Sequence, residues 1–163
     1  MYNTQNDPRA FRNALGQFPT GVTVITTLDG GGNRVGMTAN SFSSVSLDPM
    51  LVLWSIAKTA SAYDAFMQAK HFAIHVLSAD QESTSQRFSA KDGDRFAGLD
   101  CENGHGGVPL LPEFAARFEC TLESCYAGGD HDILVGRVEQ FAHRDCIPLG
   151  FHAGRYINIP DFE

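Results

Sequence analysis

The residues best placed to do chemistry form a glycine turn that leads into a histidine flanked by two aspartates. Residues 128–132 read Gly-Gly-Asp-His-Asp, and a strand-like run follows over 133–138. His131 therefore sits at the mouth of a predicted hairpin, where it either faces a ligand or is a turn residue whose ring Asp130 or Asp132 tethers. Gly136 interrupts the run, and it either leaves space for a bound group or marks a β-bulge.

Short polar side chains crowd a second segment, over residues 38–46. They are Thr38, Asn40, Ser41, Ser43, Ser44 and Ser46. On their own they are typical of the solvated face of an edge strand. The alternative is a surface where backbone amides and short hydroxyls meet a ligand, and where the small side chain of Ala39 lets that ligand approach closely.

A phosphate site is predicted over residues 55–61. Lys58 supplies a point charge there, and Thr59 and Ser61 supply hydroxyl groups. A helix predicted to begin near Ser61 adds free N–H groups and the positive end of its dipole. The alternative is a plain helix cap beside a solvated lysine.

Composition limits the class of partner. The chain has 163 residues, of which 43% are hydrophobic, as expected for one domain over residues 1–163 with its core over about 11–159. The net charge is -7 and the pI about 5.2. Because an acidic surface repels phosphate backbones, nucleic-acid binding is disfavoured. A site for a phosphate-bearing ligand must therefore bring its own positive charge or free N–H groups.

Neither a membrane segment, nor a secretion signal, nor a metal site is predicted. The first seven residues lack the basic and apolar regions of a signal peptide, and no apolar run approaches membrane-spanning length. The four cysteines include no Cys-x-x-Cys pair, so reduced thiols are expected, and the six histidines show no metal-ligand spacing. We therefore expect a cytoplasmic protein without a metal ion.

The hydrophobic pattern predicts many short strands and few helices. Helices are expected after the Asp7-Pro8 start, from a capping-box-like sequence over about 61–69, and over 80–89. Strands are expected over 22–27, 34–42, 50–56 (buried on both faces), 72–77, 117–126, 133–143 and 155–159, with a long surface excursion over 92–113. Because helices do not alternate with strands, a Rossmann sheet is disfavoured and a closed antiparallel Greek-key barrel is predicted.

Together, and in this order, residues 36–49 and 128–138 resemble the short-chain NAD(P)H:flavin oxidoreductases, the small reductase partners of two-component flavin monooxygenases. The resemblance runs from about Phe11 to Ile159. It implies a mainly β fold, an antiparallel Greek-key split β-barrel with a few short flanking helices. It also implies a homodimer that holds its flavin in a groove near the subunit interface.

The resemblance assigns roles to individual residues. The flavin ring lies against residues 38–41, and its phosphate meets residues 55–61. His131 contacts the nicotinamide nucleotide on the open face of the flavin, where it positions the nicotinamide or polarises its carboxamide and is not a general base. The implied contacts to flavin and nucleotide are Met37, Thr38, Ala39, Asn40, Ser41, Ser55, Ile56, Lys58, Ser61, Phe88, Gly129, Asp130, His131, Arg155 and Tyr156.

The implied reaction is hydride transfer from NADH or NADPH to FMN or FAD, followed by release of the reduced flavin to a separate oxygenase. Ala153 stands where the family often has a basic residue before Gly-Arg-Tyr, and the lack of a cation for a 2′-phosphate favours NADH. FMN and FAD stay open as alternatives. The rival hypothesis is a split-barrel protein that binds a flavin or another cofactor without turnover.

Overall fold

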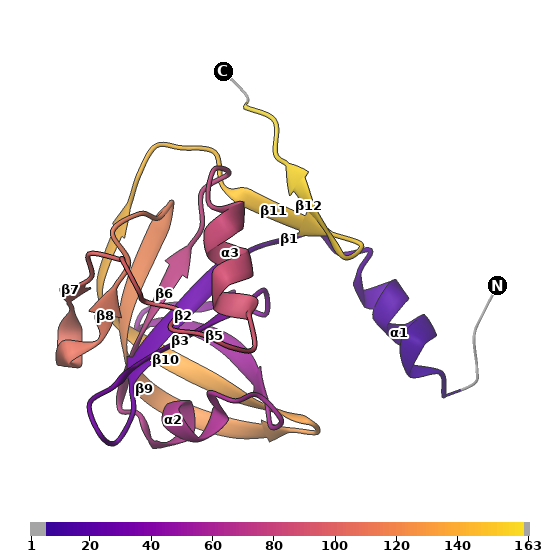
Figure 1. Ribbon diagram of the computed structural model, residues 1–163. Coiled ribbons are helices and arrows are strands. Elements are labelled where there is room, and N and C mark those ends of the chain that lie inside the picture. The colour runs from indigo at the N-terminus through magenta and orange to yellow at the C-terminus, as the bar shows by residue number, and fades with distance from the viewer. Residues whose placement is uncertain (1–5, 162–163) are drawn as a thin grey trace.

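A seven-stranded antiparallel sheet curls into a barrel that is open along one side (Figure 1). The computed structural model describes residues 6–161. Neighbouring strands follow the order β3-β2-β6-β9-β10-β5-β4. Their bounds are β2 Thr23–Leu28, β3 Arg34–Ala39, β4 Ser43–Leu47, β5 Met50–Ala57, β6 His71–Val76, β9 Ala116–Gly128 and β10 His131–His143. The edge strands β3 and β4 are consecutive in the chain but do not pair, so the fold is a split barrel and not the closed one that the strand pattern alone predicts.

Smaller elements surround the barrel. A second sheet has the order β1-β11-β12, with bounds β1 Thr20–Gly21, β11 Leu149–His152 and β12 Arg155–Asn158. A two-stranded pair and a single 3-10 turn lie in the long excursion, at β7 Glu102–Asn103, β8 Pro109–Leu110 and η1 His105–Gly107. The helices are α1 Pro8–Leu15, α2 Tyr63–Gln68 and α3 Glu82–Ser89. Figure 1 shows α2 at one end of the barrel, α3 beside β2 and β3, and α1 standing away from the barrel beyond the small sheet. None of the helices within residues 6–161 is long and apolar enough to cross a membrane.

Local sequence explains the elements that were predicted correctly. The Asp7 carboxylate accepts hydrogen bonds from the N–H groups of Arg9 at 2.9 Å and Ala10 at 3.2 Å, which caps α1 as expected. The glycine turn joins β9 to β10, and Gly129 adopts a φ of 77°, which costs glycine little. The pairing of these two strands shifts register between Val135 and Gly136, so the bulge alternative for Gly136 is confirmed.

Four local predictions are wrong. The strand expected over 34–42 ends at Ala39, because the chain leaves β3 there to reach β4. The expected capping box is absent, since α2 begins at Tyr63 and its cap residue, Ala62, makes no side-chain hydrogen bond. Strand β5 is not buried on both faces, because its side chains alternate between buried and more exposed. The excursion over 92–113 does not lie wholly on the surface, since Phe96, Val108, Leu110 and Leu111 are buried.

Strand β2 is buried on both faces and separates two hydrophobic clusters. Ile25 points into the barrel, where Trp54, Phe66 and Phe72 pack edge to face. Val24 points to the other side, into a cluster that includes Phe88 of α3. The second cluster therefore fixes α3 and the 96–111 segment against the outside of the barrel.

His75 is a buried polar link between the sheet and this outer layer. It has no solvent exposure, its Nδ1 lies 3.1 Å from the Val24 carbonyl, and its Nε2 accepts a hydrogen bond from the Leu111 N–H at 3.0 Å. This pairing requires a neutral ring with the proton on Nδ1. Burial lowers the pKa of His75 from 6.5 to about 3, so the neutral form is the folded form.

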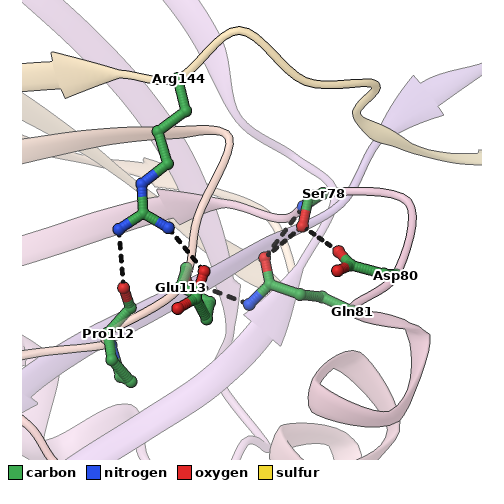
Figure 2. A network of polar contacts seen from close by, with 6 residues as sticks. All are labelled: Ser78, Asp80, Gln81, Pro112, Glu113 and Arg144. Carbon is green, nitrogen blue, oxygen red and sulfur yellow. Dashed lines mark hydrogen bonds and ion pairs between the residues drawn. The ribbon is translucent and has the colours of Figure 1, made fainter.

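A second set of polar contacts anchors the N-terminal end of α3 (Figure 2). Gln81 donates to the Glu113 carbonyl at 3.0 Å, and its side-chain oxygen accepts from the Ser78 N–H at 2.9 Å. Arg144, which directly follows β10, pairs with the Glu113 carboxylate at 2.6 Å and donates to the Pro112 carbonyl at 2.9 Å. The start of α3 is thereby held to the segment that leads into β9.

The neutral state of His75 predicts a pH dependence of stability. The unfolded chain takes up a proton near pH 6.5, whereas the folded chain resists it until about pH 3, so folding stability falls as pH falls through this window. We expect the wild-type protein to lose about 1.4 kcal/mol more per pH unit than His75→Gln, which keeps a donor and an acceptor but does not titrate. Denaturant unfolding followed by fluorescence of Trp54, the single tryptophan, measures the difference. Parallel pH profiles for the two proteins would refute this role.

Candidate active site

Two adjoining cavities form a groove beside β3. They have volumes of about 540 Å³ and about 210 Å³ and share Thr38 and Ser89. The larger is lined by Met37, Thr38, Thr59, Ala60, Ser61, Ala62, Phe88, Ser89, Lys91 and Arg95. The smaller is lined by Val22, Thr38, Ala39, Asn40, Ser85, Ser89, Phe151 and Tyr156. The groove therefore runs from the turn before α2, along the end of β3 and the side of α3, to the β11–β12 hairpin.

Strand β3 meets α3 closely because Gly36 has no side chain. A Cβ atom at Gly36 would lie 2.7 Å from the ring of Phe88, closer than carbon atoms pack. Phe88 in turn packs edge to face on Phe96, with ring centroids 5.1 Å apart. The Thr38 hydroxyl donates to the Ser85 carbonyl at 2.7 Å. These contacts make a fixed wall from β3 and α3.

The C-terminal hairpin closes the other end of the groove. The hydroxyl oxygens of Tyr156 and Ser85 are 2.8 Å apart, and the Tyr156 ring packs on Phe151 with centroids separated by 5.5 Å. The hairpin turns through Ala153 and Gly154, which have φ values of 49° and 77°. Tyr156 thus lies at the groove, as the resemblance implied, whereas Ala153 is not among the lining residues.

The larger cavity is also lined by two cations that were not among the predicted site residues. Lys91 follows α3 and is exposed, whereas Arg95 donates to the Gly36 carbonyl at 2.7 Å and also to the Ala90 carbonyl. Arg34 and Arg95 line a further cavity of about 200 Å³ beyond Ser61. Positive charge therefore gathers locally at this end of an acidic protein, as a phosphate-bearing ligand requires.

His131 lies at the tip of the long β9–β10 hairpin. Its Nδ1 is 2.7 Å from Asp130 Oδ1, so the tether to Asp130 is present. This hydrogen bond lowers the pKa of the Asp130 carboxyl, and the positive charge that the ring can carry adds to the effect. The side chain of His131 is 44% exposed, and among residues 6–161 no hydrogen bond reaches its Nε2. The ring is therefore held at one nitrogen, and its side chain is otherwise largely open to solvent.

The loop before α2 is tied to the same hairpin tip. The Lys58 N–H donates to the Asp130 carbonyl at 2.9 Å, and His131 pairs across the sheet with Ala57. The Lys58 ammonium lies 4.0 Å from Asp132 Oδ1, and the Tyr63 hydroxyl donates to Asp132 Oδ2. Because this hydrogen bond stabilises the protonated phenol, the pKa of Tyr63 is raised. The nucleotide candidate and the phosphate candidate are therefore parts of one connected unit.

The structure brings about half of the selected residues to the groove. Those that line it are Met37, Thr38, Ala39, Asn40, Ser61, Phe88 and Tyr156. Those outside its lining are Ser41, Ser55, Ile56, Lys58, Gly129, Asp130, His131 and Arg155. Within the second group, the Ser41 hydroxyl accepts from the Ser55 N–H at 2.9 Å and donates to the Ser55 carbonyl at 3.0 Å, which holds the 40–42 connection to β5. The Ile56 side chain lies in the barrel core, so only its backbone is available to a ligand.

Comparisons with known proteins show which family the chain resembles. Residues 15–160 match the family model described as flavin reductase like domain. The chain is 55% identical to the FMN reductase (NADH) SmoA of Agrobacterium fabrum over 91% of its own length and 84% of that protein. It is 47% identical to the stachydrine N-demethylase reductase subunit Stc3 of Rhizobium meliloti, over 92% of this chain and 65% of that one. For two further relatives the match covers only about half of the relative's own length, 48% of one and 49% of the other.

A solved structure extends the match to three dimensions. The NADH:FAD oxidoreductase SgcE6 of Streptomyces globisporus, crystallised with NAD and FAD fragments, superposes with a TM-score of 0.90. It is 36% identical, and the match covers 98% of each chain. The split barrel, its groove and the match over residues 15–160 lead to one conclusion: the chain belongs to the flavin reductase like domain family.

Proposed function

We propose that this protein is an NADH:flavin oxidoreductase that reduces FMN or FAD and supplies the reduced flavin to a separate monooxygenase. The observation that carries the proposal is the groove along the open edge of β3, in a chain whose relatives are named as flavin reductases and as reductase subunits of monooxygenases. When bound, a flavin accepts hydride at N5 from the nicotinamide C4, so the protein's task is to hold the two rings together.

The groove fits a flavin in size, polarity and charge. Its larger cavity of about 540 Å³ is within the range of ligand sites. Ala39 and the neighbouring unpaired backbone of the β3 edge offer donors and acceptors to the polar edge of the ring, and Phe88 offers an apolar wall. The phosphate lies toward Lys58 and Ser61, with Lys91 and Arg95 adding positive charge. Both FMN and FAD remain candidates.

His131 positions the nicotinamide. Asp130 fixes its ring through Nδ1, so Nε2 can meet the carboxamide or ribose of the nucleotide. Hydride transfer to flavin N5 needs no proton from the protein, which makes a general base unnecessary in that step. Arg155 and Tyr156 supply further contacts to the nucleotide, and NADH is favoured because Ala153 gives no cation for a 2′-phosphate.

The cytoplasm is the compartment that suits this activity. All four cysteines are free thiols, as in proteins of a reducing compartment, and NADH is available there.

Reductase turnover is the direct test of the proposal. With added FMN or FAD we expect NADH oxidation, seen as loss of absorbance at the nicotinamide band, at a rate well above that of free flavin alone. NADPH should be the poorer donor. Flavin binding without oxidation of either nucleotide would favour the rival, a split-barrel cofactor-binding protein.

Substitutions at His131 separate positioning from acid-base chemistry. We expect His131→Ala to raise the KM for NADH roughly tenfold, the value of one lost hydrogen bond, with flavin affinity nearly unchanged. His131→Asn keeps a hydrogen-bonding group and should lose less. Stopped-flow reduction of bound flavin without oxygen measures both effects. Normal NADH binding with no flavin reduction in both variants would contradict the positioning role.

The homodimer is part of the same proposal, and α1 supports it. Helix α1 buries no residue, and the apolar side chains of Phe11 and Leu15, together with that of Phe18 just after the helix, are 67%, 58% and 76% exposed. An apolar face of this kind is stable in water only when another surface covers it. A second copy of the chain provides that surface.

Removing the apolar face of α1 should dissociate the dimer. The double substitution Phe11→Ser and Phe18→Ser deletes two aromatic contacts, each worth about 1.5–3 kcal/mol if buried, and should raise the dimer dissociation constant at least ~100-fold. Asn13→Ser, on the opposite side of the helix, is the matched control. Sedimentation velocity over a range of concentrations distinguishes the species. An unchanged dimer in the double variant would exclude α1 from the interface.

A further inference from the structure

Asp132 is a buried carboxylate that faces away from His131, toward α2. Only 8% of the residue is exposed, and it pairs across the sheet with Ile56, whose side chain lies in the barrel core. A carboxylate in such a place needs partners that compensate its charge. The Tyr63 hydroxyl donates to Oδ2, and the raised pKa of Tyr63 keeps the proton on the phenol. The other oxygen has the Lys58 ammonium as its cation.

In the ion pair between Lys58 and Asp132, the lysine side chain is less constrained than the carboxylate. The Nζ–Oδ1 distance is 4.0 Å, which is too long for a direct hydrogen bond, and the Lys58 side chain is 44% exposed while that of Asp132 is 12% exposed. The carboxylate is therefore fixed, whereas no hydrogen bond within residues 6–161 occupies the ammonium, which leaves its donors available to another partner. Thr59, which directly follows Lys58, and Ser61 line the larger cavity, so the chain at Lys58 adjoins the groove although Lys58 itself is not a lining residue.

We propose that Asp132 sets the affinity for flavin by competing with the flavin phosphate for the Lys58 ammonium, and so keeps the flavin exchangeable. The inference rests on the proposed function, with Lys58 at the phosphate. A fixed negative charge 4.0 Å from the ammonium offsets much of the positive potential that a phosphate would otherwise meet. A reductase that passes reduced flavin to another protein needs a flavin that dissociates readily, because tight binding of the flavin slows its release.

The arrangement is specific to the carboxylate at this position. Strand pairing fixes where the side chain starts, and the backbone hydrogen bond from Lys58 to Asp130 fixes the loop opposite. A neutral amide of the same shape can still accept the Tyr63 hydrogen bond. Charge alone then distinguishes Asp132→Asn from the wild-type protein.

The test compares flavins with and without a phosphate. Titrations of FMN and riboflavin, without NADH, into the full-length protein give the two dissociation constants. We expect Asp132→Asn to bind FMN about tenfold more tightly, and to release it more slowly in stopped-flow displacement, with riboflavin affinity unchanged. Asp64→Asn removes the same charge from the first turn of α2 and should change FMN affinity little. In the Lys58→Gln background, Asp132→Asn should no longer tighten FMN.

Each other outcome overturns the inference. Equal FMN affinity in Asp132→Asn and wild type, in protein whose denaturant unfolding is normal, would show that Asp132 is only structural. Tightening that persists in Lys58→Gln would exclude competition for the ammonium. A lower KM for NADH with unchanged FMN affinity would assign Lys58 to the nucleotide. Failure of wild-type protein to bind either flavin would instead refute the proposed function itself.

Discussion

The whole site depends on β2 being buried on both faces. Ile25 belongs to the barrel core and Val24 to the outer cluster, so the sheet needs a second layer to cover its outer side. That layer is α3 together with the 96–111 segment, and His75 joins it to the sheet by hydrogen bonds in both directions. Because α3 covers β2, it also stands next to β3, and the groove forms between them. The fold thus places a binding surface where core packing requires a helix.

The opening of the barrel supplies the other wall of the binding surface. Strands β3 and β4 do not pair, so one edge of β3 has no strand partner where it runs beside the wall of α3. Gly36 lets this edge lie directly on Phe88, and Ser41 fastens the connection to β5 without filling the gap. A flat ligand with a polar edge can therefore meet backbone on one side and aromatic rings on the other.

The sequence predicted the elements better than the way they meet. The helix cap at Asp7, the strand β9 and the glycine turn before His131 follow from local rules, and all are present. The alternation of inward and outward side chains expected along residues 117–126 is wrong, since Glu119 is buried and Tyr126 is 58% exposed. Lys91 and Arg95 were missed because a charged loop gives no periodic signal and folds back over β3 only through tertiary contacts. The two-residue strand β1 was missed because its pairing partner, β11, lies far along the chain. His131 was selected as a site residue by the resemblance to the flavin reductase family, because the local sequence pattern alone also fits a turn histidine.

The small sheet β1-β11-β12 joins the region of α1 to one end of the groove. Its strand β1 follows α1 by a few residues, and the Ala153 N–H donates to the Gly16 carbonyl at 2.9 Å just after that helix. Its other strands carry Phe151 and Tyr156, which line the groove. If α1 docks on a second protomer, association and ligand binding act on one rigid unit, so the two equilibria are linked by mass action. The affinity for flavin then depends on protein concentration, and dilution of the reductase is itself a signal that changes its loading.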